Sequence, residues 1–204
     1  MSPEKKDALR RLQRRMRTCR LCLERGYEIQ PPAIFSGEYG ARIMLIGQAP
    51  GVTEVEADRP FNAGSGSRLF QWLAEADLEE KWFRSEQYMT AVTKCFPGKA
   101  KNGSGDRVPT RTEQNLCRPY LDEELALIDP HLILPVGRLA INLFFSAKRS
   151  LRQLIGNEFR IDGRWVIPLP HPSGASRWHQ THENRVLIQK AIEKIRRRWK
   201  RLQA

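Results

Sequence analysis

Four cysteines are the residues of this chain whose type and spacing most directly suggest chemistry. Cys19 and Cys22 form a C-x2-C pair, whereas Cys95 and Cys117 lie far downstream with 21 residues between them. In an intracellular chain, four cysteines favour metal binding over disulfides. A zinc ribbon would usually contain two close pairs, and unpaired buried cysteines would not need the C-x2-C spacing. We therefore favour a cluster bound by four thiolates, of the iron–sulfur kind.

The net charge of +12 over 204 residues indicates a polyanionic partner, because each phosphate that a basic protein neutralises releases counterions. A generally basic proteome and anionic lipid are the alternative explanations. No apolar run approaches the roughly 20 residues needed to span a bilayer. The basic segment 1–17 lacks the apolar core of a secretory signal and contains Glu4 and Asp7, unlike a mitochondrial presequence. We expect a monomeric cytoplasmic protein without membrane association, associated with the nucleoid in a prokaryote.

Alternating strands and helices would have to position the four cysteines. Apolar runs predict buried strands at 41–46, 88–93, 131–136 and 164–169, and helical periodicity predicts helices at 4–17, 67–76, 112–128, 137–145 and 188–202. This alternation is typical of a mostly parallel sheet covered by helices on both faces. We predict an α/β fold, in which residues 1–204 form a single domain of three α/β/α layers around a mostly parallel four-stranded sheet.

Three of the predicted strands lead directly into unusual loops, and sites gather at the carboxyl ends of parallel strands. The chain reads G-Q-A-P-G from Gly47 and R-P-F from Arg59. It then reads T-A-V-T-K-C from Thr90, C-R-P-Y-L from Cys117 and H-P-S-G-A-S-R from His171. The order and spacing of these motifs resemble those of the family 4 uracil-DNA glycosylases, and the resemblance covers nearly the whole chain. The resemblance implies removal of uracil or a related deaminated base from DNA, and a 4Fe-4S cluster on the four cysteines.

The resemblance also implies roles for individual residues. A glycosylase flips the target nucleotide into a closed pocket and needs hydrogen-bond donors on the base as negative charge develops there. His171 would be that donor, and Gln48 would orient the attacking water. The implied base contacts are Gly47, Ala49, Gly51, Phe61, Asn62 and Ala91. The implied DNA contacts in the minor groove are Pro172, Ser173, Gly174 and Arg177.

Two positions depart from the family 4 pattern. Gln48 stands where family 4 has a glutamate, and an amide can orient water but cannot stabilise a cationic sugar. Ala91 stands where family 4 has an asparagine that reads the uracil edge; family 5 glycosylases, which accept a wider set of lesions, typically have alanine there. The chain thus resembles a family 4 scaffold with a family 5-like base pocket. Candidates to replace the lost polar groups are Glu54, Glu56, Asp58 and Asn62.

Two function hypotheses from different classes follow. The first is a monofunctional DNA glycosylase that uses water, since no lysine occupies the first motif or the His171 motif to form a Schiff base. The second is a DNA-binding iron–sulfur protein of the same scaffold with weak or no catalysis. A zinc-bound nucleic-acid module is a third reading, which the colour of the purified protein would test.

Overall fold

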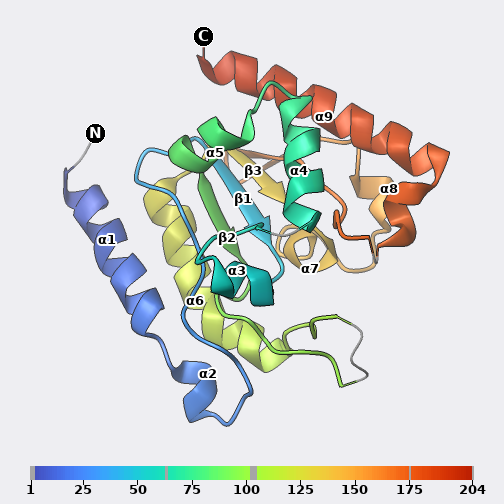
Figure 1. Cartoon of the computed structure of the whole chain (residues 1–204). Helices are drawn as coiled ribbons and strands as arrows, with labels where there is room; N and C mark the ends of the chain where they lie inside the picture. Colours follow the sequence, from blue (N-terminus) through green and yellow to red (C-terminus); the bar gives the residue numbers. More distant parts are fainter. Residues whose placement is uncertain (1–2, 63, 102–104, 175, 204) are drawn as a thin grey trace.

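The computed structural model describes residues 3–62, 64–101, 105–174 and 176–203, which form a five-stranded, mostly parallel sheet between two groups of helices (Figure 1). The strand order is β2-β1-β3-β5-β4. All pairs are parallel except β5 with β4. The strands are β1 (Ile43–Gly47), β2 (Tyr88–Ala91), β3 (Leu132–Pro135), β4 (Phe159–Ile161) and β5 (Arg164–Val166). The predicted α/β fold with a mostly parallel sheet is confirmed.

The predicted number of four strands was wrong, because the short edge strand β4 was missed. β4 pairs antiparallel with β5 through a two-residue turn, Asp162 and Gly163. Both turn residues have positive φ angles, 47° and 78°. An Asp-Gly pair with this geometry is a favoured hairpin turn, because its twist matches that of the flanking strands. The turn pair was therefore a readable signal in the sequence for the fifth strand.

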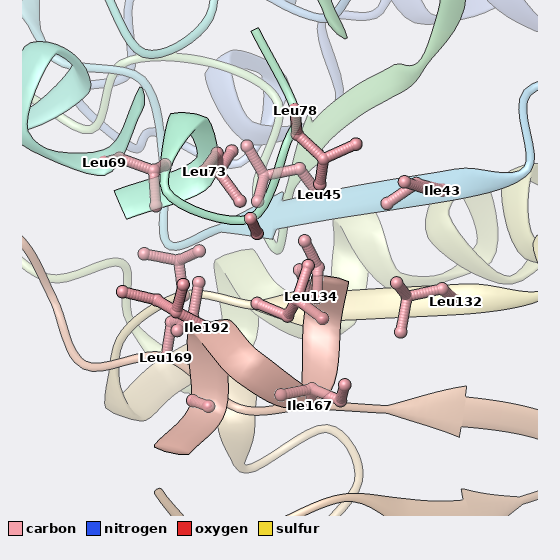
Figure 2. Close-up of a cluster of buried hydrophobic side chains, with 14 of the residues drawn as sticks. Ile43, Leu45, Leu69, Leu73, Leu78, Leu132, Leu134, Ile167, Leu169 and Ile192 are labelled. Atoms are coloured by element: carbon pink, nitrogen blue, oxygen red, sulfur yellow. The ribbon is translucent and has the colours of Figure 1, made fainter. Parts of the chain in front are cut away.

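Side chains of the central strands alternate between two hydrophobic clusters, one on each face of the sheet. Ile43 and Leu45 belong to the first cluster, whereas Met44 and Ile46 belong to the second. Figure 2 shows Ile43 and Leu45 of β1 in the first cluster, together with side chains from β3, α4 and α9. This alternation is the period of two expected of strands buried on both faces, so the three layers follow from it.

The helices divide between these faces. The first cluster contains residues of α4 (Gly64–Ala74), α5 (Glu80–Glu86), α8 (Leu151–Leu154) and α9 (His182–Gln203). The second contains residues of α1 (Pro3–Thr18) and α6 (Arg111–Ile128), which pack against each other. Four helices lie where the sequence predicted them: α1 and α9 at the two ends of the chain, and α4 and α6 between them. Within the described ranges, no helix is both long and apolar enough to cross a membrane.

Short helices occur where the motifs lie, and apart from α7 the sequence did not predict them. They are α2 (Leu21–Glu24), α3 (Val52–Glu56), α7 (Arg138–Ile141) and the 3-10 helix η1 (Arg177–Gln180). The helix expected at 137–145 is limited to α7. Each is one turn or little more, too short to show the apolar periodicity from which longer helices can be predicted. In Figure 1, α3 and α7 lie beyond the arrowhead of β1, at the carboxyl end of the sheet.

Candidate active site

Backbone hydrogen bonds hold the loops at the carboxyl end of the sheet together. The Gly47 carbonyl accepts from the Val92 amide at 3.0 Å, which joins the loop after β1 to the segment after β2. Beyond β5, the chain stays extended, and the Gly137 amide donates to the Leu169 carbonyl at 2.9 Å. The segment that carries His171 is thereby fixed beside the end of β3, so motifs far apart in the sequence meet at one edge.

An inner cavity opens at this edge of the sheet. The predicted catalytic and base-contact residues that line it are Gly47, Gln48, Ala49, Phe61, Ala91 and His171. Its remaining lining residues are Ile34, Pro50, Glu54, Pro60, Ser65, Thr90 and Val136. The walls are mainly apolar, with a few polar side chains, which is the composition expected of a pocket that encloses a flat heterocycle.

A second, outer cavity adjoins the first, and six residues line both. The shared residues are Gln48, Ala49, Pro50, Glu54, Ser65 and His171. The outer cavity adds Gly51 and Ser173, which the sequence predicted, and Asp106 and Arg107, which it did not. Asp106 and Arg107 belong to the segment 97–111, which is rich in glycine, proline and basic residues.

Phe61 is held against the inner cavity by close backbone packing. Its φ angle is positive, 52°, and its ring lies so near Gly47 that a Cβ there would be 3.0 Å from the ring carbon Cζ. Arg84 of α5 donates to the Pro60 carbonyl at 2.9 Å and to the Phe61 carbonyl at 2.8 Å. The guanidinium of Arg84 also lies 4.3 Å from the centre of the Phe70 ring. Arg84 thus braces the loop that presents Phe61, a role that nothing in the sequence indicated.

His171 is oriented by hydrogen bonds and by a glycine. The Ser173 backbone amide donates to His171 Nδ1 at 3.2 Å, and the Ser173 hydroxyl lies 2.9 Å from the same nitrogen. Because a backbone amide can only donate, Nδ1 is the acceptor, and the neutral ring carries its proton on Nε2. Gly137 lies so close that a Cβ there would be 3.1 Å from His171 Cδ2. Burial lowers the pKa of His171 below its usual 6.5, which favours this neutral form.

Asn62 is not brought to either cavity in the described part of the chain, although the sequence predicted it as a base contact. Its side-chain oxygen accepts from Arg59 Nε at 2.9 Å, and its side-chain nitrogen donates to the Thr53 carbonyl at 3.2 Å. The amide group is therefore used to fasten the loop to α3. Sequence alone could not distinguish this use from base recognition, because both require the same donor and acceptor.

The segment after His171 divides into buried and exposed residues. Pro172 is buried, and its carbonyl accepts from Arg68 of α4 at 2.7 Å. Ser173 is half-buried and engaged with the His171 ring. Gly174 and Arg177 are exposed. Of the four predicted DNA contacts, these two are the most exposed to solvent.

The four cysteines line a separate cavity. Cys19 and Cys22 come from the junction of α1 and α2, Cys95 follows β2, and Cys117 lies in α6. Burial and the neighbouring thiols raise the pKa of Cys22 to about 11 and that of Cys95 to about 12. Across the described residues, no three His, Cys, Asp or Glu side chains are gathered closely enough to hold one metal ion. The thiols are instead distributed around a shared cavity, and four thiolates there would need a cationic group between them.

A buried ion pair lies between the inner cavity and the cysteine cavity. Lys94 Nζ lies 2.7 Å from Glu124 Oε2, and the two side chains are only 2% and 0% exposed. Glu124 also accepts from the Tyr88 and Thr90 hydroxyls at 3.0 Å, and Lys94 Nζ donates to the Ala91 carbonyl at 2.6 Å. The Lys94 amide donates to Cys117 Sγ at 3.4 Å. This network connects the wall of the inner cavity to the cysteine cavity through one short segment.

Comparison with known proteins places the chain in a family. The model of the uracil DNA glycosylase superfamily matches residues 35–202. The type-4 uracil-DNA glycosylase of Thermotoga maritima is 31% identical over 162 residues, covering 78% of this chain and 79% of that protein. The Archaeoglobus fulgidus type-4 enzyme is 30% identical over 177 residues, covering 82% of each. The crystal structure of Pedobacter heparinus SMUG2 matches with a TM-score of 0.44 at 13% identity, covering 81% of this chain and 77% of that one. The superfamily model and the two type-4 relatives show that the chain belongs to the uracil-DNA glycosylase superfamily and, within it, to the type-4 enzymes.

Proposed function

We propose that this protein is a monofunctional DNA glycosylase that hydrolyses the bond between deoxyribose and uracil, or a related deaminated base, in DNA. The observation that carries the proposal is the inner cavity, where Gln48, Phe61 and His171 meet from three separate motifs. Its mainly apolar wall suits a base that has left the stack, and the adjoining outer cavity leaves room for the sugar and its phosphates.

The lining residues can perform the reaction in complementary roles. The Phe61 ring would stack on the flipped base. His171 would donate its Nε2 proton in a hydrogen bond to the carbonyl oxygen on which negative charge develops, and a neutral donor suits this because it stays bound to its proton. The Gln48 amide would orient a water on the far side of the sugar. Within the described residues, no lysine lines the inner cavity, which supports water rather than an amine as nucleophile.

The cysteine cavity supports binding of a 4Fe-4S cluster by Cys19, Cys22, Cys95 and Cys117. The donor set is all thiol, and a cavity lined by four thiols suits a group larger than a single zinc ion. The bound cluster would cross-link α1, α6 and the segment after β2. That segment continues from the wall of the inner cavity, so we assign the cluster a structural role in shaping it.

DNA would cross the outer cavity and contact Ser173, Gly174 and Arg177, with Pro172 shaping the loop from within. The net charge of +12 favours this polyanion. Residues 1–204 would act as one domain and as a monomer in the cytoplasm, where DNA of the nucleoid is the substrate.

The lesion specificity would be broader than uracil, because Ala91 offers no side-chain amide to the edge of the base. The test is a cleavage assay with alkali treatment on oligonucleotides containing uracil, hypoxanthine or xanthine, single-stranded and paired. We expect cleavage at uracil and at one or more deaminated purines. Cleavage at uracil alone would refute the broadened specificity. Binding of DNA without cleavage at any lesion would refute catalysis and favour a DNA-binding protein of the same scaffold.

A further inference from the structure

We propose that Glu54 supplies the carboxylate that the first motif lacks at Gln48. This inference rests on the proposed glycosylase function and assigns a catalytic residue to it. The water oxygen bonds to C1′ of the sugar as the bond from C1′ to the base nitrogen breaks, and the bonding electrons leave with the base. One water proton passes to Glu54, and the departing base anion is stabilised by the hydrogen bond from His171.

The position of Glu54 follows from the two adjoining cavities. When a base occupies the inner cavity and its sugar the outer one, the bond to be broken lies where the cavities meet. Residues that line both cavities surround this junction. Among the described residues that line both cavities, only Glu54 has a carboxylate. The other polar side chains of this set are those of Gln48, Ser65 and His171. The developing positive charge on the sugar would thus lie next to the Glu54 charge.

Hydrogen bonds fix the Glu54 carboxylate in place and leave acceptor capacity. Its Oε2 accepts from the Gly51 amide at 3.0 Å and the Thr53 hydroxyl at 3.2 Å. Its Oε1 accepts from the Asn62 amide at 3.2 Å. A carboxylate has about four acceptor positions, so about one position remains for a water. The carboxylate is therefore held rigidly between two loops, as required for a preorganised catalytic group.

The other acids near the first motif do not share this position. Glu56 and Asp58 are exposed, and Asp58 pairs with Arg17 of α1. Asp106 lines only the outer cavity, and its Oδ1 pairs with Lys99 at 2.8 Å. Asp106 and Glu54 meet on either side of Gly51, where a Cβ would be 2.7 Å and 2.8 Å from their carboxylate oxygens. Asp106 is therefore farther from the base, and its charge is already matched.

The coupling between Glu54 and His171 agrees with this assignment. The Glu54 charge acts to raise the pKa of His171, against the larger effect of burial. The two groups therefore lie close enough to interact across the junction. A negative group facing the sugar and a donor facing the base is the charge pattern that cleavage of this bond requires.

The test compares three variants in single-turnover excision of uracil from an oligonucleotide, using the cluster-loaded full chain. Glu54→Gln should slow excision roughly 100-fold or more, because a general base contributes about that much, with little change in DNA affinity. Glu56→Gln, an identical change at an exposed position of the same helix, should leave the rate unchanged. Gln48→Glu, added to Glu54→Gln, should restore about tenfold or more of the rate, because it returns a carboxylate to the position that family 4 uses.

The outcomes separate a catalytic from a merely structural Glu54. An excision rate for Glu54→Gln close to that of the unaltered protein would overturn the assignment while leaving the glycosylase function intact. Slow excision with a lowered unfolding temperature, and no recovery on adding Gln48→Glu, would show that Glu54 only braces the loops, and would also overturn it. Absence of excision by the unaltered protein itself would instead refute the proposed function on which the assignment rests.

Discussion

Replacing Gly66 with alanine should disturb the base pocket without substituting any residue that contacts the base. Gly66 lies in the first turns of α4, directly against the backbone of Phe61. A Cβ at this position would lie 1.9 Å from the Phe61 carbonyl oxygen and 2.5 Å from its carbonyl carbon. The obstruction is backbone rather than the flexible end of a side chain, so it cannot be relieved by a rotamer change.

The size of the effect follows from these distances. Since Cβ atoms essentially never approach within 3.0 Å of other heavy atoms, the Phe61 carbonyl must move by about 1 Å. That carbonyl also accepts the hydrogen bond from Arg84, which would be distorted. A displacement of about 1 Å at a catalytic site can cost about 100-fold in rate. Overpacking of this kind should also reduce the free energy of unfolding by about 1–3 kcal/mol.

Gly64 provides a matched control, because it lies in the same helix and a Cβ there would meet nothing within 4 Å. Gly64→Ala should keep the excision rate and slightly raise the unfolding temperature, since alanine is the better helix former. The assay is single-turnover uracil excision, with thermal unfolding monitored by circular dichroism. Equal rates for Gly66→Ala and the unaltered protein, or equal losses for the two variants, would show that the placement of Phe61 is not set by this contact.

Further substitutions test other parts of the site. His171→Ala should slow excision roughly 100-fold with little loss of DNA affinity, and equal losses in both would argue against a role in the transition state. Burial lowers the pKa of His171, while the Glu54 charge raises it and His179 lowers it further. Because the proposed donor is the neutral ring, the excision rate should hold as the pH falls to 6.5 and decline only below it; a half-maximal rate at or above pH 6.5 would contradict this. Ala91→Asn should sharpen the preference for uracil over hypoxanthine, and an unchanged ratio of the two rates would refute the assignment of Ala91 to the base edge. Glu124→Gln should cost about 3–5 kcal/mol of stability by leaving the Lys94 ammonium buried against a neutral group, and adding Lys94→Met should recover much of it. An unfolding temperature unchanged by Glu124→Gln would contradict the buried pair.

The sequence predicted the layers of the fold and several of the residues that line the inner cavity, because both depend on local patterns. Buried strands such as β1 are continuous apolar runs, and the carboxyl ends of parallel strands bring their motifs together whatever the details of the loops. The edge strand β4 was missed because its three residues, two half-buried and one exposed, carry too little apolar pattern, although Asp162 and Gly163 indicated the turn.

Residues whose role depends on contacts between distant segments could not be predicted in the same way. Asn62 and Glu54 were equal candidates to replace the lost polar groups, yet the fold turns the amide of Asn62 toward α3 and places Glu54 at the junction of the cavities. Arg84 lies in a helix with no motif, and only the folded chain shows that it holds the Phe61 loop. Such roles arise from tertiary geometry, which spacing along one chain does not encode.

Release of free uracil from a uracil-containing oligonucleotide by the purified, cluster-loaded protein is the most direct test of the cavity beside His171 as an active site. We predict that free uracil appears and that the strand stays intact until alkali is added, because water rather than an amine attacks the sugar. We also predict that His171→Ala binds the same oligonucleotide but releases uracil far more slowly. Retention of all uracil in DNA that the unaltered protein binds would contradict the proposed function.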